Sequence, residues 1–395
     1  MKILVICQYY YPEPFRISDI CEALVRRGHE VTVVTGVPNY PEGEIYQGYE
    51  NGAKREEIIN GVKVYRCYTI PRKTGAVYRL LNYSSYSYSS SRFVGLLPDD
   101  FDVVFINQLS PVMMAKAGIK YAKKYKKPCV LYCLDLWPKS LAVGGISESS
   151  LIYRHYHRVS ARIYRLIDKI LITSRSFSDY FEKEFGIDKS KITYLPQYAE
   201  ELFRNIPPKK PDTVCDLVFA GVVGTAQSVI TIVKAAEILK DKPVRFHIVG
   251  SGIELEALRE YADEHQLNNI VFYGRKPLEE MPRYYAMADA MLLTLQADPV
   301  LSLTLPGKLQ SYMSAGKPVI AAIDGEAQRV IEEARCGYCS PAEDAEALAG
   351  NIRRFADEKD KQTLARNART YYEQHFDKRA FMDQLEDVFE SMIIR

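Results

Sequence analysis

The sequence has no apolar run close to the roughly 20 residues of a membrane-spanning helix. Its first residues, MKILVICQYYYPEP, lack the apolar length and the cleavage pattern of a secretory signal, so we expect no export. The turn after this first predicted strand carries Pro12, Pro14 and Phe15 and lacks the GxGxxG pattern of dinucleotide-binding folds. This absence disfavours an NAD site.

The cysteines also lack the spacing of a metal-binding site. The eight cysteines are scattered, and Cys336 and Cys339 have no second pair at a suitable spacing, so we interpret them as structural and expect no metal. Thiols inside predicted strands, such as Cys7 and Cys133, suit a reducing compartment and favour a cytoplasmic location. With 47% hydrophobic and 26% charged residues, the chain is expected to fold, and its 395 residues fit two domains.

Charge is unevenly distributed along the chain. Residues 1–200 contain 28 lysines and arginines against 20 aspartates and glutamates, a net charge of +8, whereas residues 201–395 contain 24 against 30, a net charge of −6. The basic half is therefore expected to face something anionic.

Strand and helix patterns alternate through both halves. Residues 2–7 and 30–35 are predicted strands on either side of a helix at 18–27. The same alternation of strand and helix begins again with a strand at 216–220. The stretch NIPPKKPD, residues 205–212, reads as a linker. The pattern predicts two successive doubly wound, Rossmann-like α/β domains, with the ligand where the carboxyl ends of the two sheets face each other across a cleft.

The stretch LTLPGKLQSYMSAGKPVIA at residues 303–321 has the features of an anion site. Pro306 and Gly307 interrupt a strand, and a helix pattern follows, so Lys308 lies in the first helical turn. Free N–H groups and the helix dipole favour an anion there and repel a cation, which predicts a phosphate beside Lys308. An ordinary junction between helix and strand with a stray lysine explains the stretch equally well.

Two further candidates lie at the carboxyl ends of predicted strands in the first half. Arg16 is a candidate phosphate clamp, although a solvated loop arginine is the alternative. Asp135 follows the strand at residues 128–134, where it either serves a site or caps the next helix.

Residues 71–97 interleave basic and aromatic side chains, among them Arg72, Arg79, Tyr83 and Tyr88. This mixture suits the surface of a membrane, and it would also suit single-stranded nucleic acid or a half-buried helix.

Taken together, the blocks YYYPEPFR, PNYPEG, LDLWPKS, FAGVVGTAQ, HIVGSG, FYGRKPLEEMP and LPGKLQSYMSAGKPV resemble the GT4 family of retaining glycosyltransferases, which have the GT-B fold. The branch that the chain is most similar to contains L-fucosamine and N-acetylfucosamine transferases of capsule, O-antigen and exopolysaccharide synthesis. The resemblance implies an acceptor-binding domain at residues 1–203, a nucleotide-sugar-binding domain at 204–376 and a helix at 377–395 that crosses back to the first domain.

The resemblance also implies the ligands. The donor is a nucleotide-sugar, usually linked to UDP, and the acceptor is a sugar linked to polyprenyl diphosphate at the inner face of the cell membrane. The basic, tyrosine-rich first half would dock on that anionic membrane, and no nucleic acid is expected because no recognition module is visible.

Site residues follow from matching motif positions. Gly221 and Gly224 fall beneath the donor diphosphate, whereas the two glutamates of the family's EX7E motif fall on Leu303 and Ser311. The resemblance therefore assigns catalysis to Asp135, Lys308 and Arg16. It assigns nucleotide-sugar binding to Gly221, Gly224, Gln227, Gly250, Arg275, Lys276, Thr304, Leu305, Pro306, Gly307, Lys308, Gln310 and Ser311.

The implied reaction transfers a hexose, 6-deoxyhexose or N-acetylamino sugar with retention and without a metal or cofactor. Fixed cations stabilise the charge that grows on the departing diphosphate, and closure of the domains excludes water. The alternatives are a UDP-sugar 2-epimerase with the same architecture and a nucleotide-sugar-binding protein without catalysis.

Overall fold

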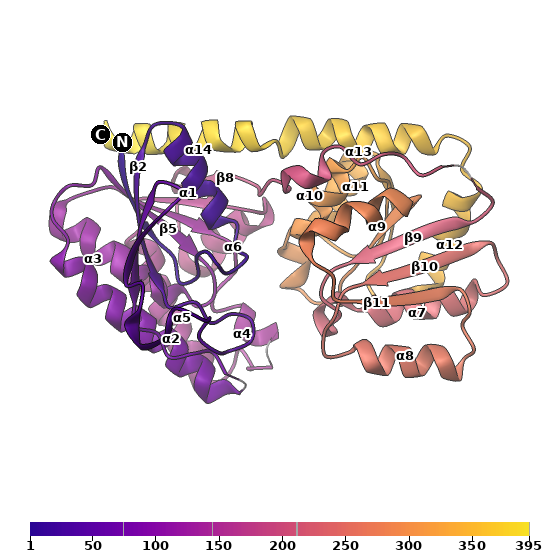
Figure 1. Cartoon of the computed structure of the whole chain (residues 1–395), viewed down its shortest axis with the longest axis horizontal. Coiled ribbons are helices and arrows are strands. Elements are labelled where there is room, and N and C mark those ends of the chain that lie inside the picture. The colour runs from indigo at the N-terminus through magenta and orange to yellow at the C-terminus, as the bar shows by residue number, and fades with distance from the viewer. Residues whose placement is uncertain (74, 144, 211, 395) are drawn as a thin grey trace. The chain divides into compact units, whose positions relative to one another are not determined.

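The computed structural model describes residues 1–395 except residues 74, 144, 211 and 395. The chain forms two compact α/β units (Figure 1). The first comprises Met1–Leu195 and Met382–Arg395, and the second comprises Pro196–Phe381. The expected domain boundary at residue 203 lies inside the second unit, because Ala199 and Phe203 are buried in its core.

The first unit contains an eight-stranded sheet in the order β3-β4-β2-β1-β5-β6-β7-β8. All neighbouring strands are parallel except β3 and β4, which form a hairpin around Asn60 and Gly61, both with positive φ. The central strands are buried along nearly their whole length, as in sheets covered on both faces. The strands are β1 (Lys2–Ile6), β2 (Glu30–Gly36), β3 (Glu56–Ile59), β4 (Val62–Cys67), β5 (Val103–Gln108), β6 (Cys129–Cys133), β7 (Lys169–Ile172) and β8 (Ile192–Tyr194).

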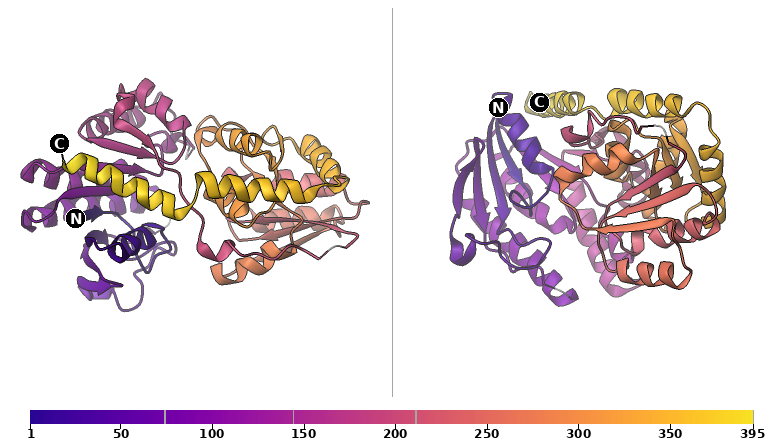
Figure 2. Two further views of the ribbon diagram at one scale, coloured as in Figure 1. Left: turned by 90° about the horizontal axis from the view of Figure 1, so that it is seen from above. Right: turned by 45° about the vertical axis from the view of Figure 1, so that its right-hand side comes forward.

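Helices, one of them only in part, also belong to the described residues of this unit. They are α1 (Ile17–Arg26), α2 (Ala76–Phe93), α3 (Lys116–Tyr125), α4 (Ser140–Val143), α5 (Leu151–Arg165), α6 (Ser176–Phe185) and most of α14 (Lys378–Ile393). Figure 2 shows α14 lying along the first unit. Phe389 of α14 packs edge-on against Phe105, and Glu386 accepts hydrogen bonds from Arg27 and His29 at 2.5 and 2.6 Å.

The second unit contains a six-stranded, fully parallel sheet in the order β11-β10-β9-β12-β13-β14. Its strands are β9 (Cys215–Ala220), β10 (Val244–Val249), β11 (Ile270–Gly274), β12 (Ala290–Thr294), β13 (Val319–Ala322) and β14 (Gly337–Ser340). Its helices are α7 (Val229–Ile238), α8 (Leu255–Glu264), α9 (Met281–Met287), α10 (Gly307–Ser314), α11 (Glu326–Ala334), α12 (Ala345–Ala356) and α13 (Lys361–His375).

This second sheet is covered on both faces. Val218 and Ala220 of β9 point into a core shared with α9, α10, α11 and α13, whereas Leu217 and Phe219 point into a core shared with α7, α8 and α12. Side chains of a strand alternate between its two faces, so both faces of the sheet are buried. The predicted doubly wound, Rossmann-like architecture is confirmed for each unit.

The predicted linker is anchored within the second unit. Lys209 Nζ lies 2.8 Å from Asp212, 2.7 Å from Asp216 and 2.8 Å from Asp289. Burial lowers the pKa of Lys209, but its hydrogen bonds with these carboxylates raise it by more. The three carboxylates are close enough to share a metal ion, and in this structure the ammonium group of Lys209 lies among them.

No helix in the described part of the chain is both long enough and apolar enough to span a membrane.

Candidate functional site

The carboxyl ends of β9, β10 and β11 form one edge of the second sheet, and glycines follow β9 and β10. Gly221 and Gly250 both have φ of 152°, a backbone angle that residues other than glycine rarely adopt. A Cβ atom on Gly250 would lie 1.8 Å from the carbonyl oxygen of Gly221. The two loops are therefore in backbone contact, held by hydrogen bonds from Gly221 N to Val249 O and from Val223 N to Ser251 O.

Lys308 lies against this glycine turn. Helix α10 begins at Gly307 after Pro306, so Lys308 is in the first helical turn, as predicted. A Cβ atom on Gly221 would lie 2.6 Å from Lys308 Nζ, which lies 4.1 Å from the centroid of the Phe219 ring. The stem of the lysine is partly exposed, but its Nζ is buried and has no hydrogen-bond partner among the described residues.

An unpartnered ammonium group in a buried position is costly. Burial lowers the pKa of Lys308 to about 7, and the positive end of the α10 dipole adds repulsion. Lys317 provides a comparison within the same unit. Burial also lowers its pKa, to about 8, but its Nζ donates to the carbonyl oxygen of Ala288 at 2.9 Å. Lys317 is thus a satisfied structural lysine, whereas Lys308 lacks the partner that an anion would supply.

The polar side chains of Gln310 and Ser311 in α10 already face backbone oxygens at the start of the same helix. The amide nitrogen of Gln310, in the orientation that satisfies it, faces the carbonyl oxygens of Pro306 and Gly307 at 2.8 and 3.1 Å. Ser311 Oγ lies 3.4 Å from Gly307 O and 3.4 Å from Glu200 Oε2. Leu305 packs its side chain into the hydrophobic core, so it offers no side-chain contact to a ligand.

The other predicted donor residues lie on neighbouring loops. Gly224 accepts a hydrogen bond from Gln227 N at 2.9 Å, and the hydroxyl of Thr304 donates to Leu301 O at 2.7 Å. Arg275 and Lys276 directly follow β11, at the same edge of the sheet as Gly221 and Gly250. The sheet order therefore gathers most of the predicted donor residues along one edge.

Sequence reasoning missed Glu200 as a candidate residue of this site. Its carboxylate approaches Ser311, the position at which the related motif has a glutamate. The two residues are 111 positions apart in the chain, so no local pattern indicates their proximity.

A second candidate site lies at the carboxyl edge of the sheet in the first unit. A cavity of about 380 Å³ is formed there by loops that follow β1, β2, β4, β5 and β6. Tyr9 stacks on Phe15 with ring centroids 4.9 Å apart, and Tyr40 lies 5.5 and 5.3 Å from these rings. The cavity therefore has an aromatic wall.

Asp135 lines this cavity together with two arginines. Burial raises the pKa of Asp135, while hydrogen bonds from the hydroxyls of Ser110 and Ser140 oppose that rise. Arg72 and Arg79 line the same cavity. A carboxyl group with a raised pKa beside two cations in a cavity has the features of a functional site.

Arg16 does not line this cavity. It stands at the N-cap of α1, where its charge acts on the buried hydroxyl of Tyr132 and opposes the rise in the pKa of Tyr132 that burial causes. The cations that line this cavity are Arg72 and Arg79, which the sequence analysis identified only as part of a basic and aromatic stretch.

Replacing Lys308 is expected to stabilise the ligand-free protein. We expect Lys308→Met to raise the melting temperature at pH 7 by a few degrees, because methionine fills similar space without an unpaired buried charge. Lys317→Met is the matched control and should lower the melting temperature, because it leaves the Ala288 carbonyl without its donor. Destabilisation by both substitutions would identify Lys308 as an ordinary structural lysine.

The effect of Lys308 on stability should also depend on pH. A lysine in the unfolded chain has a pKa near 10.5, so the unfolded state binds the proton that folded Lys308 loses above about pH 7. The free energy of unfolding should therefore rise more steeply between pH 7 and 10 in the wild type than in Lys308→Met. Urea denaturation across this range measures the difference, and parallel profiles would contradict it.

Comparison with known proteins assigns a family model to each unit. Residues 16–197 match the model Glycosyltransferase Family 4, and residues 201–371 match the model Glycosyl transferases group 1. The putative colanic acid biosynthesis glycosyl transferase WcaI of Escherichia coli is 25% identical over 97% of this chain and 98% of its own length. The probable glycosyltransferase WbjE of Pseudomonas aeruginosa is 27% identical over 60% of this chain and 62% of its own length.

Among solved structures, HepE of Anabaena in complex with UDP and glucose has the same fold. Its TM-score is 0.71 at 17% identity, and the match covers 99% of this chain and 100% of HepE. The two family models together cover most of both units, and the two Rossmann-like sheets match the fold of HepE. The chain therefore belongs to the glycosyltransferases of the GT-B fold, in the group that joins a family 4 domain to a group 1 domain.

Proposed function

We propose that this glycosyltransferase transfers a sugar, with retention and without a metal ion, from a UDP-sugar to a lipid-linked sugar in the assembly of a bacterial surface polysaccharide. The observation that carries the donor assignment is the buried, unpartnered ammonium group of Lys308 against Gly221. HepE, which shares the fold, was solved with UDP and glucose, and WcaI is named for colanic acid biosynthesis. The ligands of HepE support the choice of donor, and the name of WcaI supports the choice of process.

The donor diphosphate is the natural partner for Lys308. When the bond between the sugar carbon and the β-phosphate oxygen breaks, negative charge grows on the diphosphate. A preorganised cation and the N–H groups at the start of α10 stabilise that charge more in the transition state than in the ground state. None of the described residues supplies a counter-ion to Lys308, so an incoming diphosphate meets little competition from them.

The cavity around Asp135 supplies the acceptor side. Its aromatic wall suits the apolar face of a sugar ring, and Arg72 and Arg79 suit the diphosphate of a polyprenyl-linked acceptor. During transfer the acceptor hydroxyl oxygen bonds to the sugar carbon on the face that the diphosphate leaves, and the hydroxyl proton passes to the departing phosphate oxygen. Asp135 hydrogen-bonds an acceptor hydroxyl and orients it.

The transferred sugar is a hexose, a 6-deoxyhexose or an N-acetylamino sugar such as N-acetylfucosamine. An epimerase with the same architecture is not favoured, because the models that match both units describe glycosyltransferases. A protein that binds nucleotide-sugars without catalysis is separated from a transferase by the turnover assay described below.

UDP binding should be coupled to proton uptake. The anion favours the charged form of Lys308, so above about pH 7 the lysine gains a proton when UDP binds, and the affinity for UDP falls as pH rises further. Calorimetric titration at pH 8.5 in buffers of different ionisation enthalpy measures the uptake. In Lys308→Met the uptake should vanish and binding should weaken about a hundredfold. Equal proton uptake in the wild type and in Lys308→Met would show that Lys308 is not part of the donor site.

Donor binding and transfer should respond differently to Asp135→Asn. We expect this variant to bind UDP as the wild type does, because Asp135 lines the acceptor-side cavity, and to lose at least about a hundredfold in kcat for transfer. The assay follows a radiolabelled sugar from a panel of UDP-sugars into a lipid extract. If none of the UDP-sugars releases UDP with any extract, the protein binds nucleotide-sugars without catalysis. That result would refute the proposed transfer.

We also propose that the first unit docks on the cytoplasmic face of an anionic membrane through α2. Val77, Leu80, Leu81 and Tyr88 on this helix are between 41% and 70% exposed. Arg79 and Arg92 lie in the same helix. Apolar side chains among arginines are typical of a surface that binds anionic lipid.

Liposome flotation tests the docking surface. The wild type should float with vesicles that contain phosphatidylglycerol at low salt and less with neutral vesicles, because the arginines contribute electrostatic attraction. Val77→Ser/Leu80→Ser should reduce flotation severalfold, whereas Ile253→Ser, which changes an 89% exposed side chain of the second unit, should not. Failure of the wild type to float would exclude docking through α2.

A further inference from the structure

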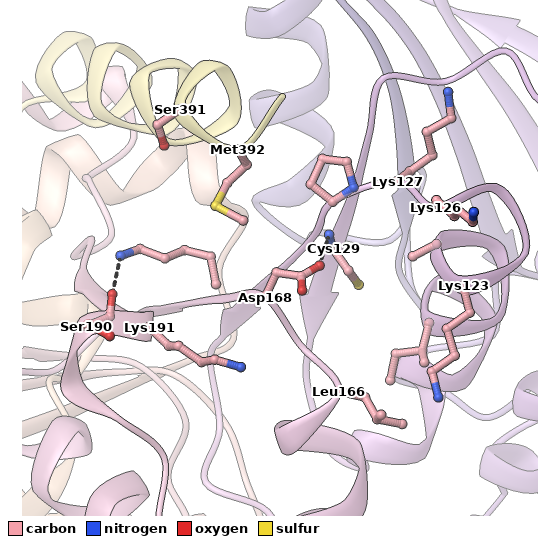
Figure 3. Close-up of a pocket in the computed structure, with 14 residues that line it drawn as sticks. Lys123, Lys126, Lys127, Cys129, Leu166, Asp168, Ser190, Lys191, Ser391 and Met392 are labelled. Atoms are coloured by element: carbon pink, nitrogen blue, oxygen red, sulfur yellow. Dashed lines mark hydrogen bonds between the residues drawn. The ribbon is translucent and has the colours of Figure 1, made fainter. Parts of the chain in front are cut away.

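A basic cavity of about 820 Å³ lies at the opposite edge of the first sheet, where β6 and β7 begin. Figure 3 shows its lining side chains, with the end of α3 on one side, the start of β8 on the other and Ser391 and Met392 of α14 above. Five lysines line it: Lys123, Lys126, Lys127, Lys169 and Lys191. We call it the lysine cavity.

These lysines have little compensating charge. Among the described lining residues, Asp168 is the one carboxylate, and it accepts a hydrogen bond from Cys129 N at 2.9 Å. Lys127 pairs with Asp99 at 3.0 Å. Lys123 and Lys126 form no ion pair with any residue that the structure describes. The lining therefore carries a large positive excess.

Lys191 Nζ donates to the carbonyl oxygen of Ile167 at 3.3 Å, and Lys169 Nζ donates to the carbonyl oxygen of Ser190 at 3.0 Å. A carbonyl group orients an ammonium group but leaves its charge in place, so Lys191 adds its charge to those of Lys123 and Lys126. An anion would relieve the repulsion among these three lysines.

The dipole of α3 explains only part of this arrangement. Lysines in the last turn of a helix are stabilised by the negative end of its dipole, which accounts for Lys123. Lys169 begins β7, and Lys191 ends a three-residue 3-10 helix (Lys189–Lys191) just before β8, so neither belongs to the last turn of α3. Lys126 has φ of 54° at the C-cap of α3, a conformation usual for glycine, so a lysine is kept there at a conformational cost.

We propose that the lysine cavity binds a ligand that carries two or more phosphate groups. Lysine acts as a mobile point charge for phosphate, and several lysines around one cavity match several phosphates. Ile119, Leu166 and Met392 add an apolar portion to the lining that suits a ring or an alkyl group of the same ligand. Such phosphates occur on soluble nucleotides and oligophosphates, and on the head groups of some lipids.

Lysine acetylation followed by mass spectrometry tests the site locally, because it reports each lysine by itself. Tripolyphosphate should reduce the acetylation of Lys123, Lys126 and Lys191 severalfold and in a saturable manner. Lys240 and Lys242 of the second unit are exposed internal controls and should not change. The same measurement with vesicles containing phosphatidylinositol bisphosphate, and with phosphatidylcholine vesicles as the control, separates a lipid source from a soluble one.

A matched pair of variants completes the test. Lys123→Gln/Lys126→Gln removes two exposed lysines, so the fold should persist, and the protection of Lys191 should require about tenfold more tripolyphosphate. Lys240→Gln/Lys242→Gln makes the same change in net charge and should leave that protection unaltered. Protection only by the lipid vesicles would assign the phosphates to a head group. Protection by neither, or equal protection in both variants, would overturn the proposal.

Discussion

Neighbouring parallel strands end at the same edge of their sheet, and this constraint places the groups on which the proposed chemistry depends. In the second unit it brings Gly221, Gly250 and the loop before Lys308 together. In the first unit it brings Asp135 and the two cavity arginines together from loops far apart in the chain. The opposite edge of the first sheet collects the starts of strands, and there the lysine cavity forms.

Three lysines of the second unit show how burial and charge are reconciled in different ways. Lys209 is surrounded by carboxylates, and Lys317 donates to a carbonyl group. Lys308 has neither kind of partner among the described residues. A charge that is already paired has little to offer a ligand, whereas an unpaired one makes the empty site less stable and the occupied site more so. The proposed donor site therefore uses the lysine whose burial is least compensated by the described residues.

Local sequence patterns predicted the parts of the site that depend on local structure. Pro306 and Gly307 set the start of α10, so the place of Lys308 in the first turn could be read directly. Glu200 lies close to Ser311, which is 111 positions away in the sequence. Phe203 packs in the core of the second unit, so the first unit ends at residue 195 and not at 203. Both depend on contacts between distant segments, which no window of the sequence records. The influence of Arg16 on the buried hydroxyl of Tyr132 was not predicted for the same reason, because a loop position does not specify which distant side chains it meets.

The path of α14 has a consequence for the order in which the protein is made. The first unit includes Met1–Leu195, which precede the second unit in the chain, and also residues from Met382 onward, which follow it. Phe389 covers Phe105, and Glu386 accepts hydrogen bonds from Arg27 and His29. A ribosome must therefore synthesise the whole second unit before the first can complete its core. The nascent first unit waits with an uncovered apolar face, and it is at this stage that chaperones would have most to protect.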